Sequence, residues 1–252
     1  MMTALLHKDT QEILRTWRVW LLALVALLSA ASGPIVTRYT TDLLQALGGA
    51  ELGDLVSALP QPTFMEAHAQ WLKDLNQVVL LALGLVAGST AASELADGSY
   101  LFTLTRGVPR WKFLASKLAS FLGVSLALLF LAVAVNAGVT YLVFHDVTWA
   151  GLCKGSLVWF ASATLTVSVA FLVGVLTFSQ VGAAGAAIGT TILLGALGMW
   201  DKVARWSPAG LSQQAHNALT GQPVSAWPIL TAVVAALVLL LVTAAVLERK
   251  EL

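Results

Sequence analysis

The sequence predicts an all-α polytopic membrane protein with six transmembrane helices in one domain over residues 1–252. Hydrophobic residues make up 58% of the chain and charged residues 11%, whereas soluble domains carry about 25% charged residues. Six apolar runs are long enough to cross a bilayer core, which takes about 20 helical residues. Because lipid offers the backbone no hydrogen-bond partners, helices are the expected form of these runs.

The distribution of Lys and Arg predicts how the spans are oriented. The spans cover approximately residues 19–36, 78–96, 118–144, 157–178, 181–200 and 227–247. With the N-terminus inside, nine Lys and Arg residues fall on the inner side and five on the outer side. Positive charge near span ends stays cytoplasmic. We therefore expect a multi-pass protein of the plasma membrane with both termini in the cytoplasm.

The first 18 residues form an amphipathic pattern before the first span. Leu6, Ile13, Trp17 and Trp20 share one helical stripe, with charged residues mostly elsewhere. This pattern favours an interfacial helix over residues 1–18 that lies along the inner leaflet. The alternative is a helical extension of the first span.

A predicted extracytoplasmic loop over residues 37–77 is too apolar to be disordered and too long for a turn. Its leucines indicate short helices, which Gly48-Gly49 would interrupt. Thr63 followed by Glu66 has the spacing of a capping box and predicts the start of a helix that runs into the second span.

The predicted cytoplasmic loop over residues 94–117 reads ELADGSYLFTLTRGVPRWKFLASK. Asp97-Gly98 predicts a helix break, and Leu101 with Leu104 indicates a short helix that ends before Pro109. Positive-inside charge alone would explain the basic residues of this loop but not the helix-turn pattern. We therefore predict a docking surface for a soluble partner.

The fourth and fifth predicted spans follow one another with almost no loop, around Ser179. The fifth span contains Gly185 and Gly189 at GxxxG spacing, which allows close approach of two helices. Two interpretations stay open, packing within the chain and an interface with another subunit.

The chain lacks sequence motifs for nucleotide chemistry, metal binding or catalysis. No G-x-x-x-x-G-K-[ST] phosphate loop occurs, and none of the four histidines belongs to H-E-x-x-H. The single cysteine, Cys153, excludes an intrachain disulfide. No paired acid, base or nucleophile is visible. We therefore expect no catalytic residues, no metal site and no enzyme activity.

Charge within the predicted spans is equally sparse. Glu94, near the inner end of the second span, is their only Asp, Glu, Lys, Arg or His residue, which disfavours proton-coupled transport. The net charge of +1 gives no reason to expect a nucleic-acid partner.

The order of these segments resembles the permease subunits of ABC-2 type transporters. The residues that carry the resemblance are Glu94, Asp97-Gly98, Leu101 to Leu104 and RGVPRWKFLASK at 106–117. PTFMEAHAQWLKDLNQ before the second span and the short hairpin around Ser179 are also similar to this family.

The resemblance implies an ABC-2 type (type V exporter) fold and a function in efflux. ATP would be bound by a separate cytoplasmic ABC ATPase subunit, so no cofactor is expected on this chain. A second permease copy or homologue would complete a homodimer or heterodimer in the lipid bilayer. The implied cargo is hydrophobic or amphipathic, such as a drug, a peptide antibiotic or a lipid-like molecule, and its binding residues stay unknown. The alternative is a membrane scaffold or regulatory component that transports nothing.

The resemblance also assigns residues to coupling with the ATPase. These coupling residues are Glu94, Asp97, Gly98, Arg106, Val108, Pro109, Arg110 and Lys112.

Overall fold

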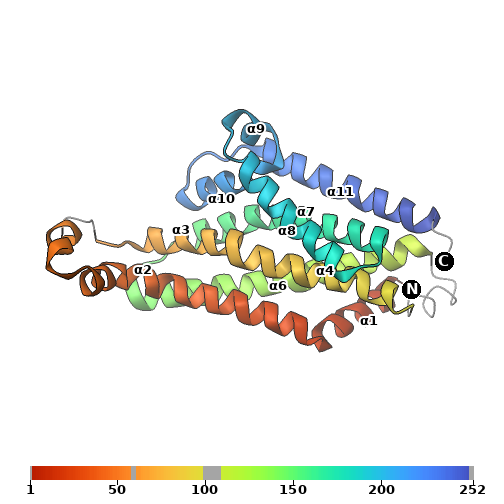
Figure 1. The fold of residues 1–252 in the computed structure, drawn as a ribbon, viewed down its shortest axis with the longest axis horizontal. Helices are drawn as coiled ribbons and strands as arrows, with labels where there is room; N and C mark the ends of the chain where they lie inside the picture. Colours follow the sequence, from red (N-terminus) through yellow and green to blue (C-terminus); the bar gives the residue numbers. More distant parts are fainter. Residues whose placement is uncertain (1, 58–60, 99–108, 250–252) are drawn as a thin grey trace.

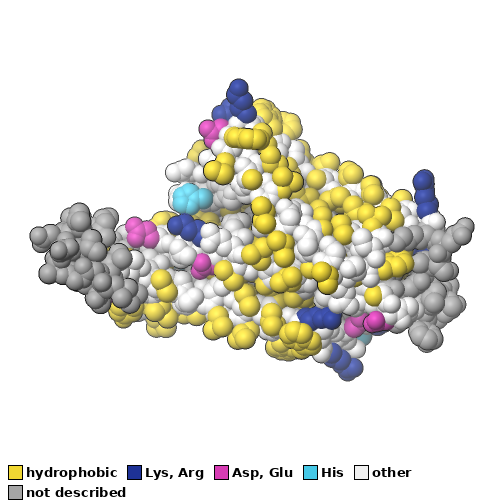
Figure 2. All heavy atoms as spheres, viewed as in Figure 1, with side chains coloured by type: hydrophobic (Ala, Val, Ile, Leu, Met, Phe, Trp, Pro, Cys, Tyr) yellow, Lys and Arg dark blue, Asp and Glu magenta, His cyan; other side chains and the backbone are white. Residues whose placement is uncertain are grey.

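A computed structural model describes residues 2–57, 61–98 and 109–249, and these residues form helices and connecting turns without strands. Six helices are long and apolar enough to cross a membrane. The prediction of an all-α chain with six membrane-spanning segments is therefore confirmed at the level of helix length and composition. Figure 2 shows hydrophobic side chains along the flank of the molecule, with charged side chains mainly toward its ends and on the part that carries α9.

The six segments overlap all six predicted spans and mostly start earlier, but α7 ends one residue and α8 three residues before the predicted ends at residues 178 and 200. The helices that carry them are α2 (Trp17–Ser57), α3 with η1 and α4 (Phe64–Asp74, Leu75–Val79 and Leu80–Ala96), α6 (Arg110–Phe144), α7 (Trp149–Thr177), α8 (Gln180–Leu197) and α11 (Ala226–Arg249). The short segments α9 (Asp201–Trp206), η2 (Pro208–Gly210) and α10 (Leu211–Thr220) connect α8 to α11. At the N-terminus, α1 (Met2–Arg15) lies at the same end of the molecule as the end of α11 (Figure 1), as an even number of spans predicts.

The centre of the bundle is formed by α7 and the helices around it. In the most apolar stretch of α7, 61% of the residues are buried, against 17% in α8 and 17% in α11. Large side chains such as Trp71, Phe121 and Phe171 fill this centre. Consequently α8 and α11 leave long apolar faces uncovered by the rest of the chain.

The expected interruption at Gly48-Gly49 does not occur, because α2 runs unbroken from Trp17 to Ser57. Glycine costs a helix about 1 kcal/mol relative to alanine. The surrounding leucines and alanines are strong helix formers and sustain the helix through this pair.

The predicted capping box at the start of α3 is confirmed. The Glu66 backbone N–H donates to Thr63 Oγ1 at 3.4 Å, and the Thr63 N–H donates to Glu66 Oε2 at 3.2 Å. From there α3 continues into α4 through η1, a single π-helical segment. The second membrane-spanning segment therefore begins at Phe64, earlier than the predicted start at residue 78.

Glycines on α4 allow the backbones of α4 and α8 to approach closely. A Cβ atom on Gly88 would lie 2.5 Å from the Ala184 nitrogen, and one on Gly84 would lie 2.7 Å from Ala187 Cβ. By contrast, a Cβ on Gly185 or Gly189 would meet no atom of the described chain within 4 Å. Gly185 and Gly189 therefore do not pack against another helix of the described chain, which leaves the subunit interface as the open interpretation of the GxxxG spacing.

Buried polar side chains connect helices in the half of the bundle farther from α1. Asn136 on α6 donates through Nδ2 to the Ala30 carbonyl of α2 at 2.9 Å, and its Oδ1 lies 3.3 Å from His68 Nδ1 of α3. Trp71 Nε1 donates to Ser156 Oγ of α7 at 3.1 Å. Such bonds contribute about 0.6 kcal/mol each in membrane proteins and fix which helices are neighbours.

The close contact between α4 and α8 gives a first prediction. Substituting Gly88→Ala would place a methyl group against the α8 backbone, and overpacking of this kind costs about 1–3 kcal/mol. We expect a lower thermal unfolding midpoint for this variant in detergent. Gly123→Ala is the matched control because its Cβ would meet nothing within 4 Å. Equal midpoints for the two variants would contradict the close α4–α8 contact.

Candidate functional site

The predicted coupling residues lie where α4 ends and α6 begins. Asp97 ends α4 as an exposed residue, and Gly98 adopts the left-handed conformation with φ of 72°, which confirms the predicted break. Pro109 precedes the first residue of α6, where its lack of a backbone N–H costs no helical hydrogen bond. Glu94 lies in α4, and its side chain is outside what the structure describes. Arg106, Val108 and the short helix expected over Leu101 to Leu104 also lie outside the described residues.

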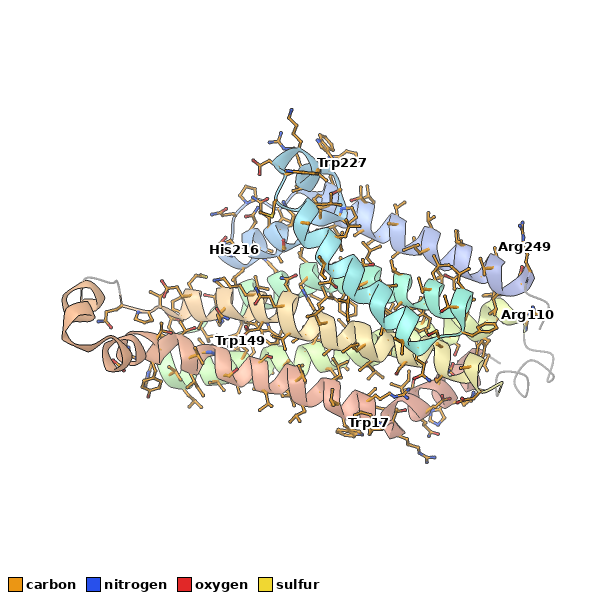
Figure 3. The ribbon with its side chains drawn as sticks, in the orientation of Figure 1. Trp17, Arg110, Trp149, His216, Trp227 and Arg249 are labelled. Carbon is orange, nitrogen blue, oxygen red and sulfur yellow. The ribbon has the colours of Figure 1, made fainter. Side chains whose placement is uncertain are left out.

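Arg110 is engaged within the chain. Its Nη1 donates to the Leu247 carbonyl at 2.8 Å and to the Glu248 carbonyl at 3.4 Å. These carbonyls are in the last turn of α11, where a cation is favourable because it lies at the negative end of the helix dipole. Arg110 thus joins the start of α6 to the end of α11, and Figure 3 shows it at that end beside Arg249.

Lys112 lies in the first turn of α6. Its Nζ is 5.5 Å from the ring centroid of Trp111, a half-exposed neighbour. A cation–π contact of this kind at an exposed site contributes about 0.5–1 kcal/mol and leaves the ammonium accessible to solvent.

The N-terminal helix α1 packs against α6 close to these residues. Ser116 Oγ donates to Asp9 Oδ2, and Ser120 Oγ donates to the Leu6 carbonyl at 3.3 Å. The helix is interrupted at Thr16, so α1 is not an extension of the first span (Figure 1). The predicted apolar stripe is divided: Ile13 is buried in the core, whereas Trp17 and Trp20 are exposed.

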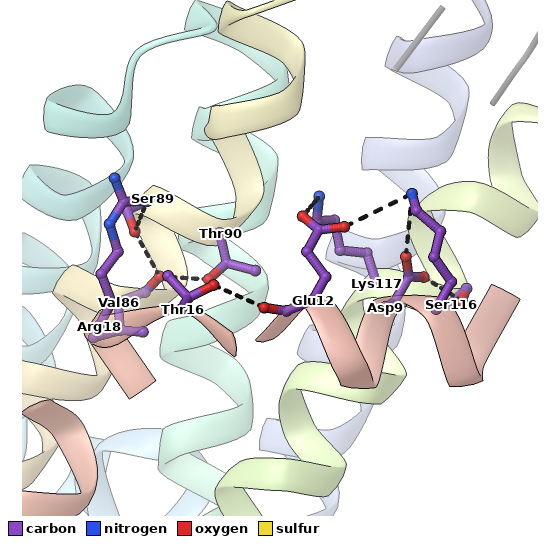
Figure 4. Close-up of polar contacts among 10 residues, drawn as sticks. Asp9, Glu12, Thr16, Arg18, Val86, Ser89, Thr90, Ser116 and Lys117 are labelled. Carbon is purple, nitrogen blue, oxygen red and sulfur yellow. Dashed lines mark hydrogen bonds and ion pairs between the residues drawn. The ribbon is translucent and has the colours of Figure 1, made fainter. Parts of the chain in front are cut away.

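Charged side chains surround the contact between α1 and α6 (Figure 4). The Nζ atom of Lys117, a buried residue, lies 3.7 Å from Glu12 Oε1. Lys8 Nζ lies 3.7 Å from Glu12 Oε2 and 3.9 Å from Asp9 Oδ1. A buried charge is strongly unfavourable without a partner, so these acids hold the Lys117 end of the predicted loop against α1.

Arg18 joins three spans at the same end of the molecule. Its Nη1 donates to Ser89 Oγ of α4 at 2.9 Å, and its Nη2 donates to Gln180 Oε1 of α8 at 3.3 Å. In the sequence, Arg18 is only one of the nine Lys and Arg residues predicted to lie on the inner side. The polar residues Ser89 and Gln180 carry no local pattern that would pair them with it.

A second candidate site is a groove at the opposite end of the spans. It has a volume of about 920 Å³ and lies between α3, η1 and α4 on one side and α8 with η2 and α10 on the other. Polar side chains from both sides line it, including Lys73 and Gln77 from the α3–η1 segment and Gln213 and His216 from α10. Figure 3 shows His216 on α10, one of the helices that border the groove. Sequence reasoning named no residue of this groove as a site.

The Arg18 contacts give a prediction on stability. Arg18→Ala removes two charge-assisted hydrogen bonds that join α2 to α4 and α8, and we expect it to cost about 1 kcal/mol. Arg15→Ala is the control, since Arg15 is exposed at the end of α1. Thermal unfolding in detergent measures both variants. A midpoint for Arg18→Ala no lower than that for Arg15→Ala would show that Arg18 does not hold the three helices together.

Comparison with known proteins places the chain in a family. A search of curated proteins finds no significant match. Residues 56–252, most of the chain, match the family described as protein of unknown function (DUF2705). This match covers every membrane-spanning segment except the first. The chain therefore belongs to the DUF2705 family.

Proposed function

We propose that this chain is the permease subunit of an ABC-2 type exporter in the plasma membrane, with both termini in the cytoplasm. The observation that carries the proposal is where the two ends of the predicted loop over residues 94–117 lie: the break at Asp97-Gly98 after α4 and the start of α6 at Arg110 are at the same end as α1 and the end of α11. The sequence supports it, because it contains no phosphate loop of its own and the resemblance to ABC-2 permeases centres on residues 94–117. A separate ATPase subunit would bind and hydrolyse ATP.

The contacts around this predicted loop suggest how motion would spread from it. A force applied between Asp97 and Pro109 acts directly on α4 and α6. Arg110 passes it to α11, and Arg18 connects α4 with α2 and α8. Five of the spans are thus connected through a few polar contacts at the proposed cytoplasmic end. In this proposal Asp97 and Lys112 face the ATPase, and Arg110 positions α6 rather than contacting the partner.

The ATPase partner can be tested with a charge reversal that leaves the fold intact. The Asp97 side chain is exposed, and no described residue bonds to it. We expect Asp97→Arg to reduce co-purification with a co-expressed ABC ATPase at least tenfold. Asp201→Arg makes the same charge change at the opposite end and should have no effect.

Two results would contradict the ATPase proposal. Either no ABC ATPase from the same genome co-purifies with the unaltered chain, or both charge reversals give the same yield of complex. Recovery of a signalling or assembly protein in place of an ATPase would instead support the scaffold or regulatory alternative.

We further propose that the open face of α8 contacts a second copy of the permease or a homologue. Gly185 and Gly189 leave backbone uncovered on this face, and Ile192 beside them is 66% exposed. In a bilayer, small residues of this kind favour helix association because two backbones can approach closely.

Cross-linking tests this subunit contact. Gly189→Cys in a Cys153→Ser background should form a disulfide-linked dimer when membranes are oxidised, because the two α8 faces would meet. Val234→Cys on α11 is an equally lipid-accessible control and should stay monomeric, since α11 is not part of the proposed contact. Equal cross-linking at both positions, or none at position 189, would exclude α8 as the interface.

A further inference from the structure

We infer that the outer groove binds an amphiphile with an anionic head group. This inference deepens the proposed function by naming the class of cargo, and it rests on that proposal only for the statement that the ligand is transported. The groove lies at the end of the spans opposite Asp97 and is open at its side along α8.

Lys73 gives the groove its positive charge. Its described lining contains Lys73 and His216 but no carboxylate. Lys73 is exposed, and none of the described acidic residues forms an ion pair with it. A cation in a concave, partly apolar surface attracts anions more strongly than the same cation on a flat surface, because the low-dielectric walls focus its field.

The two acidic residues of α3 are turned away from the groove. Glu66 Oε2 accepts from the Thr63 backbone in the capping box. Asp74 Oδ1 accepts from Gln70 Nε2 at 2.8 Å, and its Oδ2 lies 3.4 Å from where a Cβ on Gly33 of α2 would be. Neither carboxylate lines the groove, although Asp74 is next to Lys73 in the chain and interacts electrostatically with it. Lys73 is therefore the charged side chain in the described lining of the groove.

Unused hydrogen-bond donors lie beside this positive charge. Among the described residues, no hydrogen bond takes up the side chains of Gln77, Ser212 or Gln213, which line the groove from both walls. Two other lining hydroxyls, those of Ser162 and Thr191, are already donated to carbonyls of their own helices. The available donors together with the ammonium suit a carboxylate or phosphate, which offers only acceptors when ionised.

The apolar part of the groove suits an alkyl or similarly hydrophobic tail. Leu80 and Leu81 form its wall on α4, and Ile192 and Leu194 form its wall on α8. The exposed side chain of Ile192 continues this wall onto the open face of α8. Among its lining residues there is no Trp, Tyr or Phe on which a sugar ring would stack. The combination therefore favours an anionic amphiphile over a cationic drug or a saccharide.

Binding of a fluorescent fatty acid tests this inference. Purified full-length protein in an uncharged detergent is titrated with a dansyl-labelled undecanoic acid and, in parallel, with the dansyl-labelled undecyl amine. We expect the acid to bind at least tenfold more tightly than the amine. Lys73→Glu should weaken the acid at least tenfold, whereas Lys202→Glu, on exposed α9 outside the groove, should not change its affinity.

A second variant tests the site without changing its charge. A side chain at Gly195 would extend into space that no other atom occupies within 4 Å, so Gly195→Trp should fill the groove and still fold. We expect it to weaken binding of the acid at least tenfold. Excess acetate should not displace the probe, since an isolated carboxylate lacks the tail.

Three outcomes would overturn the inference: equal affinity for acid and amine, full displacement by acetate, or unchanged binding in both Lys73→Glu and Gly195→Trp. The binding assay contains no ATPase. If the acid does not bind but the ATPase still co-purifies, the proposed function is retained and only the groove inference is refuted. Conversely, binding of the acid without an ATPase partner would support the site and refute only its role in export.

Discussion

The close approach of α4 and α8 is the contact on which the rest of the architecture depends. Gly84 and Gly88 bring the two backbones together, and Ala183, Ala184 and Ala187 meet them from α8. Since α8 is the least buried span together with α11, this contact decides which face of α8 turns inward. The opposite face, with its own glycines, is left for lipid or another subunit.

The same contact explains where the groove is located. Toward the end of α4 opposite Asp97, glycine gives way to Leu80 and Leu81, and the regular helix gives way to the π-helical segment η1. Larger side chains and the altered helical winding keep α4 and the last turns of α8 apart at this level, where the groove lies. Single π-helical segments within α-helices are frequent at functional sites. Here η1 supplies Asn76 and Gln77 to the groove.

Features that depend on local sequence could be predicted, and those that depend on distant partners could not. The six spans follow from runs of apolar residues, and the capping box at Thr63 follows from residues three positions apart. The bond from Arg110 to the end of α11, and that from Ser116 to Asp9, join residues more than 100 positions apart. In the sequence, Arg110 and Asp9 look like ordinary charged residues near span ends and Ser116 like an ordinary small polar residue. Glycine spacing alone did not decide between packing within the chain and a subunit contact, and the structure shows that Gly84 and Gly88 make the contact within the chain whereas Gly185 and Gly189 do not.

Helix α4 connects the two candidate sites, which limits how they could act on each other. It runs from η1 beside the groove to Asp97 at the proposed cytoplasmic end. Between these points Gly88 faces the α8 backbone and Gly84 faces the methyl group of Ala187, so the inner parts of the two helices are closely packed and constrained to move together. Beyond Gly84 no glycine of α4 allows this close approach, and the groove lies between the two helices there. In the proposed exporter, a displacement at Asp97 would tilt the inner parts of α4 and α8 as a pair, and the width of the groove would change only where the two helices diverge beyond Gly84. Such a link between the ATPase and the cargo would need no charged relay through the membrane.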